Sequence, residues 1–171
     1  MIKNRNEFPD LLHKHNCKIG LELGVSRGGF SYYLNTHYTF EKFYGIDSWN
    51  SRGRDAKEYV NTCRKLKKFT NVEVYRGLFE EMLCIFPDEY FDFIYIDGYA
   101  HLGNISKDTK QNTIEQWYCK LAPGGIYSGH DYCSEFPLNV ATVDSFCKQR
   151  NKQLNVTTEI DSKEPSWWVI K

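Results

Sequence analysis

Several features are absent from this 171-residue sequence, and each absence narrows the classes of protein it could belong to. No apolar run is long enough to cross a bilayer, and the N-terminus lacks the apolar segment of a secretory signal. The six cysteines form no Cys-x-x-Cys pair, which argues against a zinc site and against a disulfide framework. We therefore expect a cytoplasmic protein with no membrane partner.

Net charge is absent as well, because 22 lysines and arginines balance 22 aspartates and glutamates. Without a net positive electrostatic field, neither nucleic acid nor an anionic membrane is favoured as a partner. No internal repeat, low-complexity tract or proline-rich linker divides the chain. We expect a single domain over residues 1–171, large enough for a full hydrophobic core.

Strand-like and helix-like apolar patterns alternate almost throughout the chain. The predicted helices cover residues 6–15, 28–36, 54–68, 78–85, 106–120 and 138–151. The predicted strands cover residues 18–23, 42–47, 71–76, 91–97, 124–130, 153–160 and 166–171. Such alternation predicts a doubly wound α/β fold with a mostly parallel seven-stranded sheet, and the last two strands form an antiparallel C-terminal hairpin. Ligands of such a sheet lie at the carboxyl ends of its strands.

A glycine turn follows the first predicted strand, in Ile19-Gly-Leu-Glu-Leu-Gly-Val-Ser-Arg-Gly-Gly29. Gly24 and Gly28 allow backbone N–H groups to approach a bound molecule closely. A dinucleotide fingerprint would be Gly-x-Gly-x-x-Gly, but Ser26 replaces the middle glycine and Glu22 precedes the loop. This carboxylate would repel a pyrophosphate and suits a cationic nucleotide that carries an amino acid.

A second carboxylate, Asp47, ends the next strand, Phe43-Tyr-Gly-Ile-Asp47. It lies roughly twenty residues beyond the loop, the spacing at which an acid contacts ribose hydroxyls in this type of fold. The alternative is that Glu22 and Asp47 cap helices or are solvated at loop ends. Phe79 follows the third strand, and it could stack on an adenine ring or anchor the next helix.

Carboxylates and imidazoles also follow the fourth and fifth strands. The fourth strand ends in Asp97 with His101 after it, and the fifth ends in His130-Asp131. Because the ends of adjacent parallel strands meet at one edge, we expect these four residues to converge. Each histidine could take a proton from a hydroxyl or an amine, or serve only as a structural hydrogen-bonding residue.

Taken together, the motifs resemble class I S-adenosylmethionine-dependent methyltransferases over about Gly20 to Tyr132. Glu-x-Gly-x-x-x-Gly resembles their first motif. The macrocin-type small-molecule O-methyltransferases are similar in the later motifs, which are Asp92 to His101, Asp108, Trp117, Leu121-Ala-Pro-Gly-Gly125 and Gly-His-Asp-Tyr132.

The resemblance implies methyl transfer from S-adenosylmethionine to a hydroxyl or an amine of a small molecule or a glycan. The implied cofactor-binding residues are Glu22, Gly24, Ser26, Gly28, Asp47, Phe79 and Asp97. The implied catalytic residues are Asp97, His101, His130 and Asp131.

The resemblance leaves the use of a metal open. Some members of the subfamily hold a divalent ion on the acid that ends strand four and on two acids after strand five. Asp97 and Asp131 match such positions, whereas His130 replaces the first acid of the pair. Magnesium prefers oxygen ligands, while manganese tolerates the nitrogen. The alternatives are a magnesium or manganese ion on Asp97 and Asp131, or a metal-free reaction with His130 or His101 as the base.

Two other classes of protein are less consistent with these residues than a methyltransferase. An NAD-dependent oxidoreductase or epimerase is disfavoured by Glu22 and Ser26. A non-catalytic nucleotide-binding protein of the same fold is disfavoured by the intact Asp97, His130 and Asp131. No acceptor pocket is evident in the sequence, so a second copy of the chain in a homodimer could complete one.

Overall fold

The strands form a seven-stranded sheet in the order β3-β2-β1-β4-β5-β7-β6. The computed structural model describes residues 2–50, 55–98, 107–158 and 164–171, with the backbone alone for 107–111. The parallel strands are β1 (Ile19–Leu23), β2 (Lys42–Asp47), β3 (Val72–Arg76), β4 (Phe91–Ile96) and β5 (Leu121–Gly129). Strand β7 (Trp167–Ile170) is antiparallel to β5 and to β6 (Asn155–Val156). The predicted fold class is therefore confirmed.

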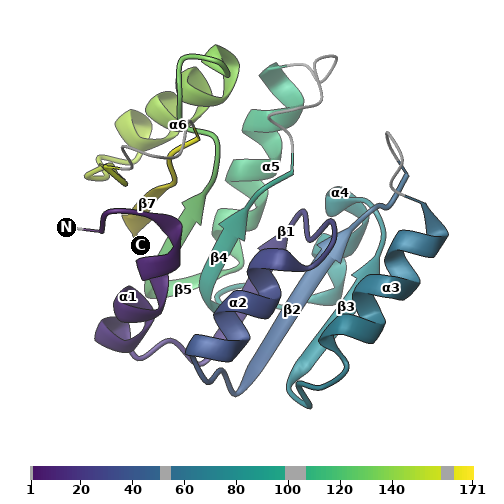
Figure 1. The fold of residues 1–171 in the computed structure, drawn as a ribbon. Coiled ribbons are helices and arrows are strands. Elements are labelled where there is room, and N and C mark those ends of the chain that lie inside the picture. The colour runs from purple at the N-terminus through teal and green to yellow at the C-terminus, as the bar shows by residue number, and fades with distance from the viewer. Residues whose placement is uncertain (1, 51–54, 99–106, 159–163) are drawn as a thin grey trace.

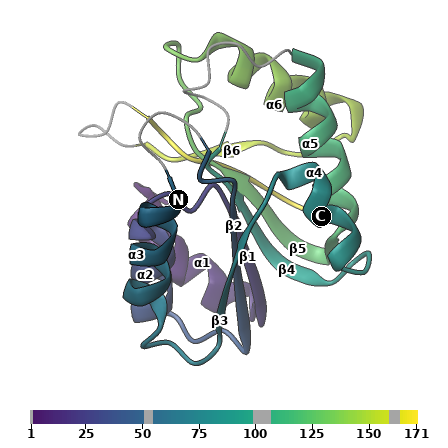
Figure 2. The same cartoon turned by 90° about the vertical axis from the view of Figure 1, so that its right-hand side faces the viewer.

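Helices cover both faces of this sheet (Figures 1 and 2). One face carries α1 (Phe8–His15), α2 (Gly29–His37) and α3 (Ala56–Leu66), and a 3-10 turn, η1 (Arg5–Glu7), precedes α1. The other face carries α4 (Phe79–Met82), the 3-10 turn η2 (Leu83–Ile85), α5 (Lys107–Cys119) and α6 (Pro137–Gln149).

The central position of β4 in the sheet explains why its sequence is almost continuously apolar. Phe93 and Tyr95 pack on the α1 and α2 side, in a cluster with Phe8 and Phe30. Ile94 packs on the opposite side, among residues of α5 and α6. A central strand that is buried on both faces needs apolar side chains at successive positions.

The start of the fifth strand is predicted wrongly. Strand β5 begins at Leu121, ahead of the Pro-Gly-Gly segment, rather than at residue 124. From the pair Phe91–Leu121 to the pair Phe93–Ile126, two steps along β4 match five along β5, so the extra residues form an irregularity in the ladder. Gly124 has a φ of 80° there. A proline and a left-handed glycine are tolerated in a strand where the ladder is interrupted.

Three other predicted elements differ in extent. The leading helix is η1 followed by α1, and the helix predicted at 78–85 divides into α4 and η2. The strand predicted at 153–160 is paired only over Asn155–Val156 within the described residues, and 159 and 160 lie outside them. None of these differences changes the strand order.

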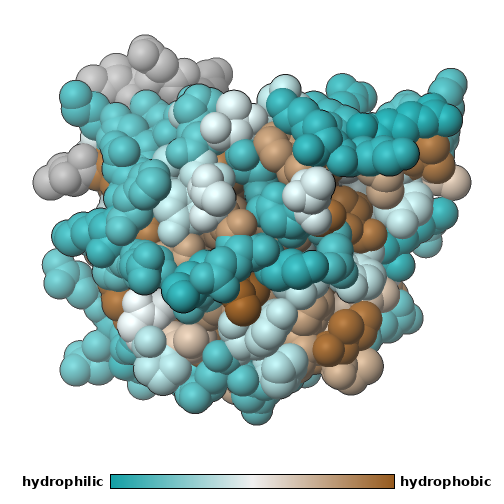
Figure 3. Space-filling view, turned by 90° about the horizontal axis from the view of Figure 1, so that it is seen from below, coloured by the Kyte–Doolittle hydropathy of each residue, from teal (hydrophilic) through white to brown (hydrophobic). Residues whose placement is uncertain are grey.

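The parallel strands all point toward the same end of the molecule. The carboxyl ends of the parallel strands point to the upper side of Figure 1. Viewed from below, the surface is mostly hydrophilic, with hydrophobic side chains in separate patches (Figure 3). Among the described helices, none has both the length and the apolar character of a membrane span. The fold therefore directs attention to the carboxyl ends, where ligands of such sheets lie.

Candidate active site

The loop after β1 is held against both neighbouring strands. The N–H of Gly24 donates to the carbonyl of Ile46 at 2.8 Å. Gly24 has a φ of 98°, and a Cβ at this position would collide with the carbonyl oxygen of Asp97. Glycine is therefore required here for the contact with the end of β4. The sequence suggested only that Gly24 makes room for a ligand, and that role stays a prediction.

Glu22 belongs to β1, just ahead of this loop, and is only 1% exposed, so the alternative of a solvated carboxylate is wrong. The Ser31 hydroxyl on α2 donates a hydrogen bond to it. Burial raises the pKa of Glu22 to about 8, although the Ser31 hydrogen bond lowers it, and the nearby charge of Asp97 raises it further. A cation placed beside Glu22 would favour the ionised form, so the group is suited to a positively charged ligand.

Asp47 organises two backbone turns. One oxygen accepts from the N–H of Ser26 at 2.8 Å, and the other accepts from the N–H of Trp49 at 2.9 Å. Ser26 and Trp49 have left-handed φ values of 49° and 42°. Asp47 is 6% exposed, so its observed contacts are those of a capping group. Each carboxylate oxygen can accept a further bond, so the predicted ribose contact remains compatible with these interactions.

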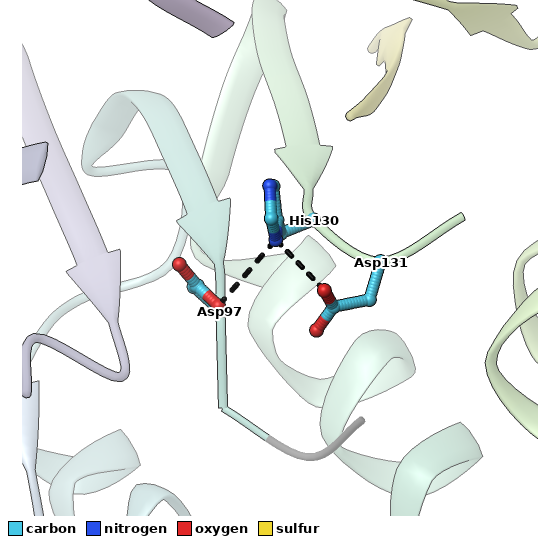
Figure 4. Close-up of side chains that lie close together, drawn as sticks. All are labelled: Asp97, His130 and Asp131. Atoms are coloured by element: carbon cyan, nitrogen blue, oxygen red, sulfur yellow. Dashed lines mark hydrogen bonds and ion pairs between the residues drawn. The ribbon is translucent and has the colours of Figure 1, made fainter. Parts of the chain in front are cut away.

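Three of the four predicted catalytic residues come together at the ends of β4 and β5 (Figure 4). The Nδ1 atom of His130 lies 2.8 Å from Asp131 Oδ1 and 3.9 Å from Asp97 Oδ1. Asn139 of α6 donates to the carbonyls of His130 and Asp131, at 3.0 and 2.8 Å. These bonds hold the turn in which Asp131 has a φ of 61°. The fourth residue, His101, lies outside the described residues.

The protonation of His130 is set by two opposing effects. Burial lowers the pKa of His130, but the hydrogen bond with Asp131 and the charge of Asp97 outweigh it, so the pKa is raised above its usual 6.5. The contact at Nδ1 orients the ring and leaves Nε2 as the nitrogen for proton transfer to or from a ligand. This is the arrangement that a general base requires.

Phe79 and Gly28 have clear packing roles. Phe79 is buried in the core cluster that contains Leu23, and a Cβ on Gly98 would lie 2.6 Å from the Phe79 ring. Gly28, with a φ of 66°, precedes α2, and its position is close to the methyl group of Thr62. Anchoring thus describes the observed contacts of Phe79, and its contact with adenine stays a prediction.

Arg5 is a member of the site that the sequence did not reveal. Its Nη1 atom lies 3.5 Å from Asp97 Oδ2, and its guanidinium carbon lies 5.4 Å from the centre of the Phe30 ring. Burial lowers the pKa of Arg5, but the neighbouring Tyr95 and Asp97 outweigh it and raise the pKa. Arg5 belongs to no strand end and to no glycine loop, so no pattern in the sequence singled it out.

The same residues could also serve as ligands of a metal ion. Asp97, His130 and Asp131 each offer a ligand atom, and these atoms lie within 4.8 Å of one another. Two carboxylates and one imidazole fit manganese or another transition ion better than magnesium. The 2.8 Å contact of His130 with Asp131 is also a complete hydrogen bond without any ion. The donor set therefore fits either of the two predicted arrangements.

A family model described as a methyltransferase domain matches residues 17–132, which is 116 of the 171 residues. A comparison with curated proteins gives no match.

Solved structures with the same fold include three methyltransferases. An O-methyltransferase from Bacillus cereus in complex with SAH is 17% identical, with a TM-score of 0.71 over 98% of this chain and 80% of that one. A SAM-dependent methyltransferase from Aquifex aeolicus is 17% identical, with a TM-score of 0.67 over 98% and 90%. The N-methyltransferase NodS from Bradyrhizobium japonicum WM9 is 15% identical, with a TM-score of 0.67 over 96% and 94%. At these identities the likeness concerns the fold.

Proposed function

Because the chain belongs to the methyltransferase-domain family, we propose that it transfers a methyl group from S-adenosylmethionine to a hydroxyl or an amine of a small molecule or a glycan. Methyl transfer from this cofactor follows from the family, and the nicotinamide alternative is not favoured. The chemical class of the acceptor is proposed from the site itself. It is carried by one observation, the convergence of Asp97, His130 and Asp131 at a strand end that contacts Gly24 of the loop after β1.

The cofactor supplies a methyl group that is already activated on a sulfonium. Glu22 and Asp97 would face its positive charges, and Asp47 would accept from its ribose hydroxyls. The backbone of Gly24, Ser26 and Gly28 would line the loop around the methionine part, and Phe79 would lie against adenine. The buried state of Glu22 supports this assignment, because a desolvated carboxylate favours a cationic partner.

His130 would take the proton of the acceptor through Nε2 while the acceptor oxygen or nitrogen is held in line with the methyl group. Asp131 would keep the ring in place and stabilise the imidazolium that forms. Positioning of the two reactants alone can supply on the order of 7–11 kcal/mol. The protein thus needs to provide little more than alignment and one base.

The clustering of three ligand atoms favours a second arrangement of the same reaction. In it, Asp97 and Asp131 hold a divalent ion that would lower the pKa of the acceptor hydroxyl. Removal of metals with a chelator separates the two arrangements. With His130 as the base, we expect turnover to change less than twofold. Loss of turnover that manganese restores would support the metal instead.

The test of the proposed function uses methyl-labelled S-adenosylmethionine with panels of hydroxyl and amine acceptors. The His130→Gln variant should lose about 10²- to 10⁴-fold in turnover, because the general base is gone. Its affinity for S-adenosylhomocysteine should stay within twofold. The matched control is His37→Gln, an exposed histidine on α2. An unchanged rate in His130→Gln would remove this residue from the mechanism, and transfer to neither panel would overturn the proposed acceptor class.

Our proposal also takes residues 1–171 as one catalytic domain that acts in the cytoplasm, as a homodimer if a second copy completes the acceptor pocket. All six cysteines are free thiols, which supports a reducing compartment. Light scattering after size-exclusion chromatography, with and without S-adenosylhomocysteine, would show whether two chains associate. A monomer that is fully active would contradict the dimer.

A further inference from the structure

A positive side chain reaches the active site from a segment outside the family match. The match begins at residue 17, whereas Arg5 belongs to η1, ahead of α1. Its guanidinium forms the 3.5 Å ion pair with Asp97 and has Tyr95 as a hydrogen-bond partner. Its side chain is 38% exposed, so it lies at the rim of the site with one side open to a ligand.

The segment that carries Arg5 is firmly anchored. Phe8, three residues later, is fully buried, and its ring lies 6.4 Å from that of Phe30 and 5.5 Å from that of Tyr95. The Tyr33 hydroxyl on α2 donates to the carbonyl of Asn6 at 2.9 Å. One anchor within η1 and one directly after it hold the Arg5 backbone beside β4. The position of the guanidinium is therefore built into the fold.

The charges around Arg5 suggest what it recognises. The site contains four carboxylates, which belong to Glu22, Asp47, Asp97 and Asp131. The methionine end of S-adenosylmethionine carries a sulfonium, an ammonium and a carboxylate. Protein carboxylates suit the two cations and repel the anion, which needs a cation of its own. A guanidinium pairs with a carboxylate through two parallel hydrogen bonds.

We propose that Arg5 binds the α-carboxylate of the methionine part of the cofactor and thereby makes the protein prefer cofactors that carry this group. The inference rests on the proposed function, because it places the cofactor beside Glu22 and Asp97. In the structure Arg5 pairs with Asp97. On binding, the ammonium of the ligand takes its place beside Asp97, and Arg5 pairs with the ligand carboxylate. Arg5 is thus a binding residue and takes no part in proton transfer.

The experiment measures affinity by calorimetry for two ligands. One is S-adenosylhomocysteine, and the other is its analogue that lacks the carboxylate and keeps the amine. The wild type should prefer the first by about tenfold or more, as expected for a charge-assisted pair. In Arg5→Gln this preference should fall to within about threefold, mainly through weaker binding of S-adenosylhomocysteine. Arg5→Lys should recover part of the preference.

The matched control is Lys3→Gln, which removes one exposed positive charge two residues away and should leave both affinities within twofold. Thermal unfolding of each variant checks that it is folded. Equal losses for both ligands in Arg5→Gln, or no loss for either, would overturn the inference while leaving the proposed function intact. Failure of the wild type to bind either ligand would overturn the proposed cofactor site, and this inference with it.

Discussion

At the scale of single residues, the burial of Glu22 makes the stability of the folded protein depend on pH. Its pKa is about 8 in the folded protein and close to 4.5 in an exposed chain. The folded protein therefore keeps a proton that the unfolded chain has lost, so its stability falls as the pH rises from about 4.5 to about 8. At neutral pH the cost is up to about 3 kcal/mol.

Glu22→Gln should remove this cost. We expect the unliganded variant to be more stable than the wild type at pH 7, by up to about 3 kcal/mol, with the difference vanishing near pH 4. Its affinity for S-adenosylmethionine should fall, because the counter-charge is lost. Urea unfolding at several pH values and calorimetry measure the two effects. Glu80→Gln, an exposed change, is the control. A stability difference that does not vary with pH would contradict the explanation.

The effect of a Cβ can be compared at Gly24, in the loop after β1, and at Gly29, the first residue of α2. Gly24→Ala places a Cβ against the Asp97 carbonyl at a φ of 98°, and we expect it to lose more than about 2 kcal/mol of stability. Gly29→Ala is the control, because a Cβ there meets nothing within 4 Å and lies in the first turn of α2. That change should be neutral or stabilising by up to about 1 kcal/mol. Equal unfolding midpoints for both variants would show that the loop can relax.

The sequence predicts the positions of some site residues but not of others. Asp97, His130 and Asp131 could be predicted to meet, because they end strands that the fold places side by side. Arg5 could not, because its place depends on how α1 packs against β4 and α2, and three-dimensional packing leaves no local motif. The packing role of Gly24 was hidden for the same reason, since its close neighbour Asp97 is 73 residues away.

At the scale of elements, periodicity predicts the strands and helices, but interruptions are harder to foresee. The Pro-Gly-Gly segment looks like a turn ahead of β5, yet its irregularity is absorbed within the ladder between Phe91 and Phe93. The extent of β5 depends on its pairing with β4, and the sequence of one strand does not specify how it pairs with another. The short β6 is similar, because among the described residues only Asn155 and Val156 are paired with β7 in the sheet.

The attachment of α1 can be tested through Phe8, which is fully buried among the rings of Phe30, Phe93, Tyr95 and Trp168. Phe8→Ala should cost about 3–5 kcal/mol of stability, because it leaves a cavity between α1 and the sheet. It should also weaken S-adenosylhomocysteine binding, since η1 loses its anchor. Leu138→Ala, at a site 47% exposed, should change stability by less than about 0.5 kcal/mol. A stable Phe8→Ala protein would show that α1 is not needed for the fold.

At the scale of the whole molecule, the alternation of strands and helices was enough to predict a doubly wound sheet, and the two closing strands to predict its antiparallel edge. The family match shows the class of cofactor, and the residues proposed to bind it lie at the carboxyl end of the sheet. There we expect the buried Glu22 to favour a cationic sulfonium nucleotide over a dinucleotide that brings a pyrophosphate. Both ligand classes bind folds of this shape, so only the side chains at the strand ends can distinguish them.

This distinction predicts how ligands affect the unfolding of the whole chain. At a concentration 100 times its dissociation constant, a ligand that binds only the folded state stabilises it by about 2.7 kcal/mol. For a chain of this size, that amounts to a rise in Tm of about 5–10 °C. We expect this rise with S-adenosylhomocysteine and none with NAD at the same concentration, measured by calorimetric scanning. In Glu22→Gln the rise with S-adenosylhomocysteine should be smaller, because the amide cannot ionise beside the ammonium of the ligand. A rise with NAD in the wild type would contradict the role given to Glu22.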